Sequence, residues 1–304
     1  MEKEPDDEEN KEVIDHWRIS EKLQSDEKCS HKFIIGNHKA KQYLCEGIML
    51  PFRYPQFFVS LRSPTKSYLL FGPKGSGKEF IIDMIAQDSN AKVETIDFSD
   101  IKWEETRIEN NKILIEVIDN IFNDSCKENQ KIIWLKNIDN LKPGADYYSR
   151  ALMTTLLLNF SNISLKNSLA VIATSEAPWG INPSIRRRLD KRIYCKLPGR
   201  QDRLEMLQSN ILGFESLFTE EEISQICELT EGFGFSDLDG LIESIIKYPL
   251  SHLTQDPMIF EVAIEQLDIP KISLDEVQKY IEAVTPPTFD DSKFEKWRED
   301  FTDF

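Results

Sequence analysis

The stretch Gly72-Pro73-Lys74-Gly75-Ser76-Gly77-Lys78-Glu79 decides the fold of this chain. Its spacing, G-x-x-x-x-G-K, is that of a phosphate-binding P-loop, in which glycines let backbone N–H groups turn toward phosphate oxygens. A short apolar run precedes it at residues 68–71, and helical spacing follows at residues 80–86. Strand, glycine-rich loop and helix is the order that a phosphate site needs, because the helix N-terminus also favours an anion. The sequence therefore predicts a nucleotide-binding loop in which Lys78 reaches the β- and γ-phosphates.

The position after Lys78 departs from the P-loop pattern. It normally holds Ser or Thr, whose hydroxyl ligates Mg²⁺. Here it holds Glu79, whose carboxylate repels phosphates unless a cation lies beside it. The motif thus predicts a nucleotide as the bound cofactor and puts both Mg²⁺ binding and hydrolysis in doubt.

The apolar pattern predicts an α/β fold with a parallel sheet between helices. Candidate strands at residues 68–71, 93–98, 131–135, 169–174 and 192–195 alternate with helical stretches such as 113–122 and 149–160. After residue 199 only helical patterns follow, which predicts a small helical lid. We expect an acidic flexible arm at residues 1–32, an α/β nucleotide-binding domain at 33–198, and a lid at 199–304 that ends in an amphipathic helix at 291–301.

Composition narrows the class of protein. The net charge of −16 over 304 residues disfavours nucleic acid as a partner, since nucleic-acid binding needs a basic surface. No apolar run reaches about 18 residues, so no membrane span is expected. The 5 cysteines and 4 histidines are scattered without metal-ligand spacing, which predicts no metal site and a reducing, cytoplasmic location.

Four further segments share the pattern of one known family. They contain Pro178-Trp179, the run Ile185-Arg186-Arg187-Arg188-Leu189-Asp190, the stretch Thr230-Glu231-Gly232-Phe233, and Phe294-Glu295-Lys296-Trp297. Together with the P-loop they resemble the AAA ATPases of the meiotic clade: katanin, spastin, fidgetin and the vacuolar-sorting ATPase that disassembles ESCRT filaments. The resemblance runs from about Phe33 to the end. It implies an ATP-binding module in a ring of AAA subunits, either copies of itself or an active relative, with a protein polymer as substrate.

The resemblance also exposes departures at catalytic positions. In this family the strand matching residues 131–135 ends in Asp-Glu, where Asp helps to hold Mg²⁺ and Glu orients the attacking water. This chain has Lys136 and Asn137 there, and an ammonium cannot ligate a metal. The first-sensor Asn of the family falls on Glu176, or on Ser175 if one residue is inserted. The resemblance therefore implies that hydrolysis is lost or severely impaired.

Two pairs of alternatives remain open around the nucleotide. Glu79 and Lys136 are expected to be neighbours on the metal side, where their opposite charges form a salt bridge; alternatively, both changed independently in an unused site. Phe235 stands at the adenine side, where the family commonly has Gly. Its ring either shields the base or fills the base pocket.

Other expected functional residues lie outside the nucleotide pocket. Arg187 and Arg188 match the arginine fingers that reach into a neighbouring subunit's ATP, or they form a solvated basic helix end. Lys102 and Trp103 match the first pore loop, which grips a threaded peptide, or Trp103 is a buried anchor. The acidic residues that follow Trp103 would repel acidic tubulin tails and weaken a microtubule-severing function.

The sequence leaves three alternative functions. The favoured one is an ATP-binding pseudo-ATPase that serves as a regulatory or structural ring subunit and supplies its arginines in trans. The second is an active ATPase that drives microtubule severing or ESCRT filament disassembly. The third is a nucleotide-free scaffold, in which the Glu79–Lys136 pair and Phe235 fill the site.

Overall fold

The computed structural model describes residues 35–58, 64–99, 108–123, 130–141, 147–163, 168–211, 218–253, 272–284 and 290–301. A parallel five-stranded sheet of order β2-β3-β4-β1-β5 forms its centre. The strands are β1 (Ser67–Phe71), β2 (Lys92–Asp97), β3 (Lys131–Lys136), β4 (Leu169–Ser175) and β5 (Lys191–Tyr194). The predicted α/β class is confirmed, and every predicted strand end lies within one residue of the observed end.

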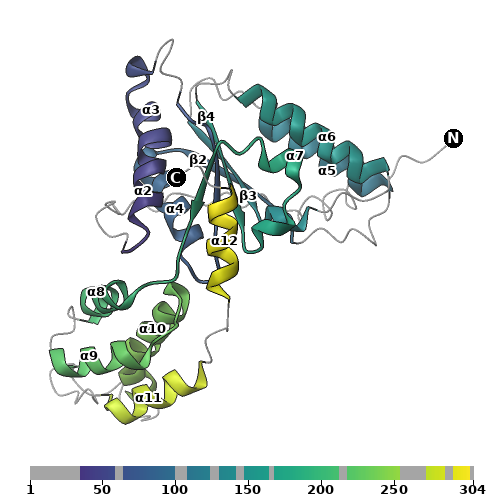
Figure 1. Ribbon diagram of the computed structural model, residues 1–304. Helices are drawn as coiled ribbons and strands as arrows, with labels where there is room; N and C mark the ends of the chain where they lie inside the picture. Colours follow the sequence, from purple (N-terminus) through teal and green to yellow (C-terminus); the bar gives the residue numbers. More distant parts are fainter. Residues whose placement is uncertain are drawn as a thin grey trace.

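Helices cover both faces of the sheet (Figure 1). On one face lie α2 (His38–Leu44), the π-helix η2 (Cys45–Met49), α3 (Leu50–Arg53) and α4 (Lys78–Ser89); on the other lie α5 (Ile108–Asn123) and α6 (Tyr147–Asn162). Side chains of β1 alternate between the two cores: Tyr68 and Leu70 face α4, whereas Leu69 and Phe71 face α5 and α6. Burial on both faces explains why the inner strands β1, β3 and β4 are largely apolar, whereas the edge strands β2 and β5 are only partly buried and carry charged residues.

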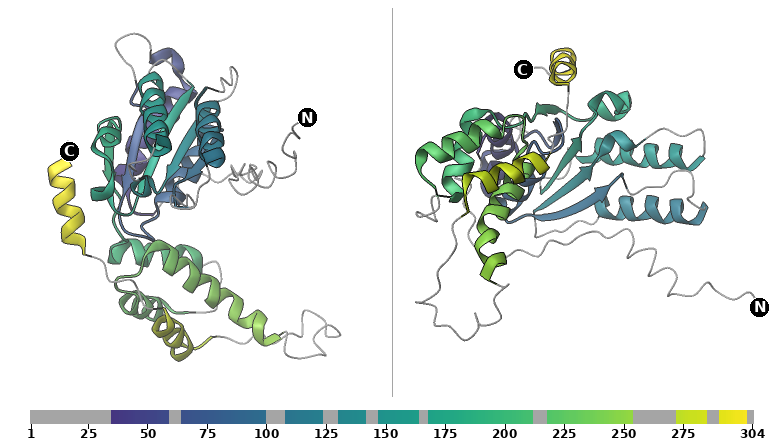
Figure 2. Two further views of the ribbon diagram at one scale, coloured as in Figure 1. Left: turned by 90° about the vertical axis from the view of Figure 1, so that its right-hand side faces the viewer. Right: turned by 90° about the horizontal axis from the view of Figure 1, so that it is seen from below.

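A second group of helices has its own core. It comprises α8 (Arg200–Ile211), α9 (Glu220–Leu229), α10 (Phe235–Leu253) and α11 (Leu274–Ala283), packed around residues such as Leu207 and Ile245. Capping boxes begin α9 at Thr219 and α11 at Ser273. Figure 2 shows this group below the sheet, joined to it by the chain after β5. The helical lid predicted after residue 199 is present, and its exact boundary stays a prediction.

The last helix, α12 (Asp291–Phe301), packs on the sheet and not on the other lid helices (Figures 1 and 2). Phe294 and Trp297 are each 5 % exposed and belong to the core on the α5–α6 face. The Trp297 ring lies edge-on to Phe71, with ring centroids 4.6 Å apart. The bounds predicted for this helix are confirmed, but its packing joins it to the nucleotide-binding part.

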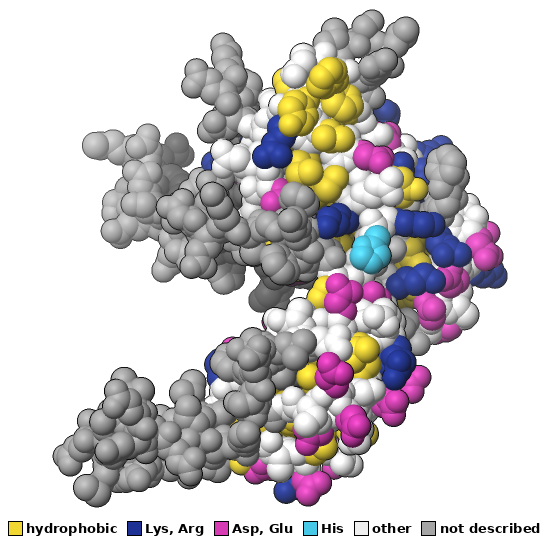
Figure 3. Space-filling model, turned by 90° about the vertical axis from the view of Figure 1, so that its left-hand side faces the viewer, with side chains coloured by type: hydrophobic (Ala, Val, Ile, Leu, Met, Phe, Trp, Pro, Cys, Tyr) yellow, Lys and Arg dark blue, Asp and Glu magenta, His cyan; other side chains and the backbone are white. Residues whose placement is uncertain are grey.

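The surface around α2 and α3 carries several apolar side chains (Figure 3). Leu50, Tyr54 and Phe57 are exposed there, and Phe57 follows α3 in the 3-10 helix η3 (Pro55–Phe57). Among the helices in the described part of the chain, none is both long and apolar enough to cross a bilayer.

Replacing Trp297 by Ala is expected to undock α12, because the substitution leaves a cavity against Phe71. We expect the free energy of unfolding to fall by about 3–5 kcal/mol, measured by chemical denaturation. Hydrogen exchange of residues 291–301 should become faster. Phe80→Ala is the control, because that ring lies on α4, is 52 % exposed and should lose less stability. Equal losses for both variants would contradict the docking of α12.

Candidate functional site

The P-loop is packed tightly against the ends of two other strands. Its first residue, Gly72, donates its N–H to the carbonyl of Ser175 at 3.2 Å. A Cβ on Gly72 would lie 2.0 Å from the carbonyl oxygen of Cys195, so only glycine fits. Gly75 and Gly77 have φ of 79° and 81°, in the left-handed region that glycine tolerates best. The loop therefore has the backbone that the motif predicted.

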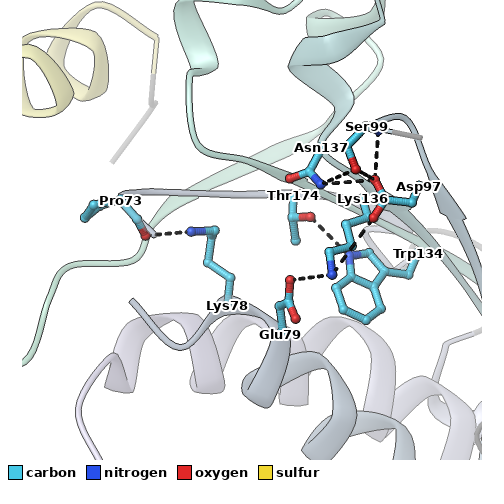
Figure 4. Close-up of polar contacts among 9 residues, drawn as sticks. All are labelled: Pro73, Lys78, Glu79, Asp97, Ser99, Trp134, Lys136, Asn137 and Thr174. Atoms are coloured by element: carbon cyan, nitrogen blue, oxygen red, sulfur yellow. Dashed lines mark hydrogen bonds and ion pairs between the residues drawn. The ribbon is translucent and has the colours of Figure 1, made fainter. Parts of the chain in front are cut away.

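Lys78, the first residue of α4, is folded back onto the P-loop (Figure 4). Its Nζ donates to the carbonyl oxygens of Gly72 at 2.9 Å and Pro73 at 2.7 Å, and lies 3.2 Å from Ser76 Oγ. The side chain is buried, and this burial lowers the pKa of Lys78 below its usual value. A phosphate that enters the loop has to displace these carbonyls from the ammonium.

Glu79 and Lys136 form the predicted ion pair. The Nζ of Lys136 lies 2.8 Å from Glu79 Oε1 and 4.0 Å from Asp97 Oδ2 (Figure 4). Asp97 ends β2 and is the register partner of Lys136 at the end of β3. The side chains are 28 % exposed for Lys136 and 56 % for Glu79, so water screens their attraction. A pair this exposed contributes about 0.2–1 kcal/mol.

Asn137 is turned toward β2. It has φ 55° and ψ 47°, and its Nδ2 donates to Asp97 Oδ1 at 3.0 Å and to Ser99 Oγ at 3.4 Å. The side chain at the predicted water-orienting position is therefore engaged by the end of β2. An amide there offers no carboxylate base for water in any case.

These residues do not fit a Mg²⁺ ion held in the usual way. Mg²⁺ takes oxygen ligands in octahedral geometry at about 2.0–2.1 Å. The ammonium of Lys136 stands where the ligand Asp is expected and already engages the Glu79 carboxylate. In the described part of the chain, no three His, Cys, Asp or Glu residues are grouped to hold a metal.

A cavity of about 340 Å³ lies beside the outer side of the P-loop, between the sheet, the lid and α12. Glu176, the predicted first sensor, lines it and is exposed. Its lining carries three carboxylates and two ammonium groups: Glu176, Asp237, Asp290, Lys74 and Lys293. This balance disfavours a polyphosphate there, so phosphates belong inside the loop and not in this cavity.

Asn37 is a site residue that sequence reasoning missed. It precedes α2 with φ 46°, and its Nδ2 donates to the Ser76 carbonyl at 2.9 Å. Its Oδ1 accepts from the Lys196 N–H at 3.0 Å. The side chain thus ties the N-terminal segment to both the P-loop and the linker that leads to the lid. No local motif marks this role, because the partners of its side chain are distant in sequence.

Phe235 begins α10 directly above the P-loop. Its N–H donates to the Gly75 carbonyl at 2.7 Å, and its half-buried ring lies against Gly77. The ring also touches Gly36, on the segment that Asn37 fixes. The structure therefore places Phe235 beside the P-loop, and its position at the adenine side stays a prediction.

Arg187 and Arg188 lie away from this pocket, exposed after α7 (Pro183–Arg186). Neither side chain forms an ion pair with any residue that the structure describes. Their neighbour Arg186 stacks on the Phe301 ring, with Cζ 3.9 Å from the centroid. This contact anchors the segment to α12. The predicted pore-loop residues Lys102 and Trp103 lie outside the described residues.

Residues 68–197 match the model of the ATPase family associated with various cellular activities (AAA). The chain contains an AAA ATPase domain. It is 29 % identical over 224 residues to vacuolar protein sorting-associated protein 4 of Dictyostelium discoideum, covering 71 % of this chain and 49 % of that protein. Zebrafish (Danio rerio) spastin is 29 % identical over 278 residues, covering 89 % and 47 %. The chain thus spans about half the length of these curated relatives.

Solved AAA structures have the same fold. The FIGL-1 AAA domain in complex with ADP superposes with a TM-score of 0.74 at 24 % identity, covering 99 % of both chains. A katanin structure, from work on katanin self-assembly, gives a TM-score of 0.70 at 24 % identity and covers 94 % of this chain and 96 % of that chain. The AAA domain of this chain has the fold of these structures, and its P-loop ends in Glu79 where the motif has Ser or Thr.

A double-mutant cycle on the ion pair, with Glu79→Gln, Lys136→Gln and both together, tests its strength. We expect a coupling free energy of about 0.2–1 kcal/mol, because both groups are partly solvated. It should fall between about 0.1 M and 1 M salt, where the Debye length shrinks from about 10 Å to 3 Å. The exposed pair Glu243–Lys247 on α10 is the matched control. Absence of coupling at low salt, with coupling in the control, would refute the contact.

Proposed function

We propose that this chain is a catalytically inactive AAA subunit that binds ATP through its P-loop without hydrolysing it. One observation carries the proposal: the ammonium of Lys136 lies 2.8 Å from the Glu79 carboxylate at the point where an AAA enzyme holds its metal. Hydrolysis needs that metal and a base that orients water. Loss of a positioned base alone commonly slows a reaction about 10²–10⁴-fold.

The remaining positive charge suits nucleotide binding without a metal. Lys136 neutralises the carboxylate of Glu79 beside the loop, and Lys78 supplies a cation inside it. The backbone N–H groups of the P-loop do not depend on either substitution. We therefore infer that ATP binds equally well with and without Mg²⁺.

In the proposed role the subunit works inside a ring of AAA subunits in the cytoplasm. Arg187 and Arg188 are exposed, as residues that complete a neighbour's site have to be. We propose that the neighbour is an active relative and that the ring acts on a protein polymer, by analogy with spastin and katanin. The alternative of an active severing or filament-disassembling ATPase needs a metal held by phosphates and water alone.

A second candidate, a scaffold that binds no nucleotide, is favoured by the contacts of Lys78. The ammonium has three polar neighbours within the loop itself, two of them carbonyl oxygens, so the loop is satisfied without a ligand. Ligand binding measured directly separates this candidate from the first.

Thermal unfolding with ATP, in Mg²⁺ and in EDTA, tests the proposal together with a turnover assay. ATP at 100 times its dissociation constant should add about 2.7 kcal/mol of stability, equally in both buffers. No phosphate release is expected in either. Stabilisation only in Mg²⁺ together with turnover would overturn the proposal, and no stabilisation at all would favour the scaffold.

Two variants serve as controls for that experiment. Lys78→Ala should abolish the stabilisation by ATP, because it removes the ammonium inside the loop. The triple variant Glu79→Thr, Lys136→Asp and Asn137→Glu restores the usual metal ligand types. Its stabilisation by ATP should become dependent on Mg²⁺, whereas that of the wild type should not.

The arginine fingers are tested with an active AAA relative from the same cell whose own finger arginines are replaced by Ala. Such a subunit is inactive alone, and adding this chain should restore its ATPase activity. Arg187→Ala with Arg188→Ala should reduce the restored rate about 10³-fold or more. The control is Arg53→Ala, an exposed arginine on α3. Equal restoration by the double variant would exclude a role in trans.

A further inference from the structure

The ring of Phe235 bridges two glycines beside the P-loop. A Cβ on Gly77 would lie 3.2 Å from its Cδ2, and a Cβ on Gly36 would lie 2.9 Å from its Cζ. Gly77 belongs to the P-loop and Gly36 to the segment before α2, so the ring spans the space between them.

All three segments around this ring are fixed to one another. Asn37, next to Gly36, donates to the Ser76 carbonyl of the P-loop at 2.9 Å. The Phe235 N–H bonds the Gly75 carbonyl at 2.7 Å, and a Cβ on Gly234 would lie 2.9 Å from that same oxygen. The ring is therefore part of the packed wall and not a loose side chain at its rim.

The geometry of a P-loop says which part of a nucleotide would meet the ring. Lys78 reaches the β- and γ-phosphates, and the backbone N–H groups around it hold the α- and β-phosphates. The γ-phosphate therefore points toward the carboxyl edge of the sheet, where Lys136 ends β3 and Ser175 ends β4. The ribose and base must leave on the opposite side, next to Gly77, where the Phe235 ring lies.

We propose that Phe235 occupies the position of the base, so that this site selects its ligand by the phosphate chain and not by adenine. The ligand class is a condensed phosphate, whether inorganic or the tail of any nucleoside triphosphate. The inference rests on the proposed binding function and specifies its selectivity. Of the two alternatives, shielding and filling, the proposal takes filling, because two atoms of the ring edge, Cζ and Cδ2, lie against the two walls of the space beside the P-loop.

Calorimetric titration with ATP, GTP and inorganic tripolyphosphate, each in EDTA, tests the proposal on the full chain. We expect dissociation constants of the wild type within about threefold of one another, because no base contact distinguishes the ligands. In Phe235→Gly the affinity for ATP should rise roughly tenfold or more as the base gains its pocket, while that for tripolyphosphate stays unchanged. In Phe235→Ala the affinity for ATP should also rise, but by less than in Phe235→Gly.

Phe57→Ala, an exposed phenylalanine on η3, is the control and should leave all three affinities unchanged. A wild type that prefers ATP over tripolyphosphate about tenfold or more, and loses this preference in Phe235→Gly, would overturn the inference in favour of stacking. If the wild type binds none of the three, a gain of ATP binding in Phe235→Gly still supports it, and no gain refutes it. ATP hydrolysis by the wild type would contradict the proposed function without changing this comparison.

Discussion

A parallel sheet brings the carboxyl ends of its strands to one edge, and every feature of this site depends on that constraint. The P-loop leaves β1, Asp97 ends β2, Lys136 ends β3 and Ser175 ends β4, all at the same edge. A residue at one strand end therefore contacts the side chains at the neighbouring strand ends, whatever its charge. Lys136 therefore lies next to Glu79 and Asp97 whatever its function.

In the function proposed above, the ammonium of Lys136 takes the place where a P-loop enzyme holds a divalent ion. An ammonium offers hydrogen-bond donors but cannot bridge two phosphates and polarise water as a metal does. It nevertheless offsets the negative charge of Glu79, which would otherwise repel a nucleotide. The two substitutions compensate each other for binding and not for catalysis. Because Glu79 and Lys136 compensate each other for binding only, the pair fits a subunit that binds ATP without hydrolysis better than it fits a slow ATPase.

Much of this arrangement follows from local sequence, and some of it does not. The strands and the P-loop were predictable because apolar runs and glycine spacing are local signals, and the Glu79–Lys136 contact followed from the family's metal geometry. The contacts of Asp97 required the register of β2 against β3, which pattern alone does not supply. Asn37 joins three distant segments, and the docking of α12 depends on aromatic contacts such as Trp297 with Phe71. For Phe235 the sequence left shielding and filling open, because the difference lies in the path of the segment at Gly36.

Loss of hydrolysis and loss of anion binding are separable in this fold, because different residues carry them. The catalytic departures lie at the end of β3, whereas Lys78 and the glycine backbone of the P-loop are intact. Burial lowers the pKa of Lys78, which means that its charged form is held in the loop at a cost. Carbonyl dipoles offset part of that cost, and a phosphate, with a full negative charge, offsets more. The loop therefore keeps an electrostatic reason to bind an anion that does not depend on hydrolysis.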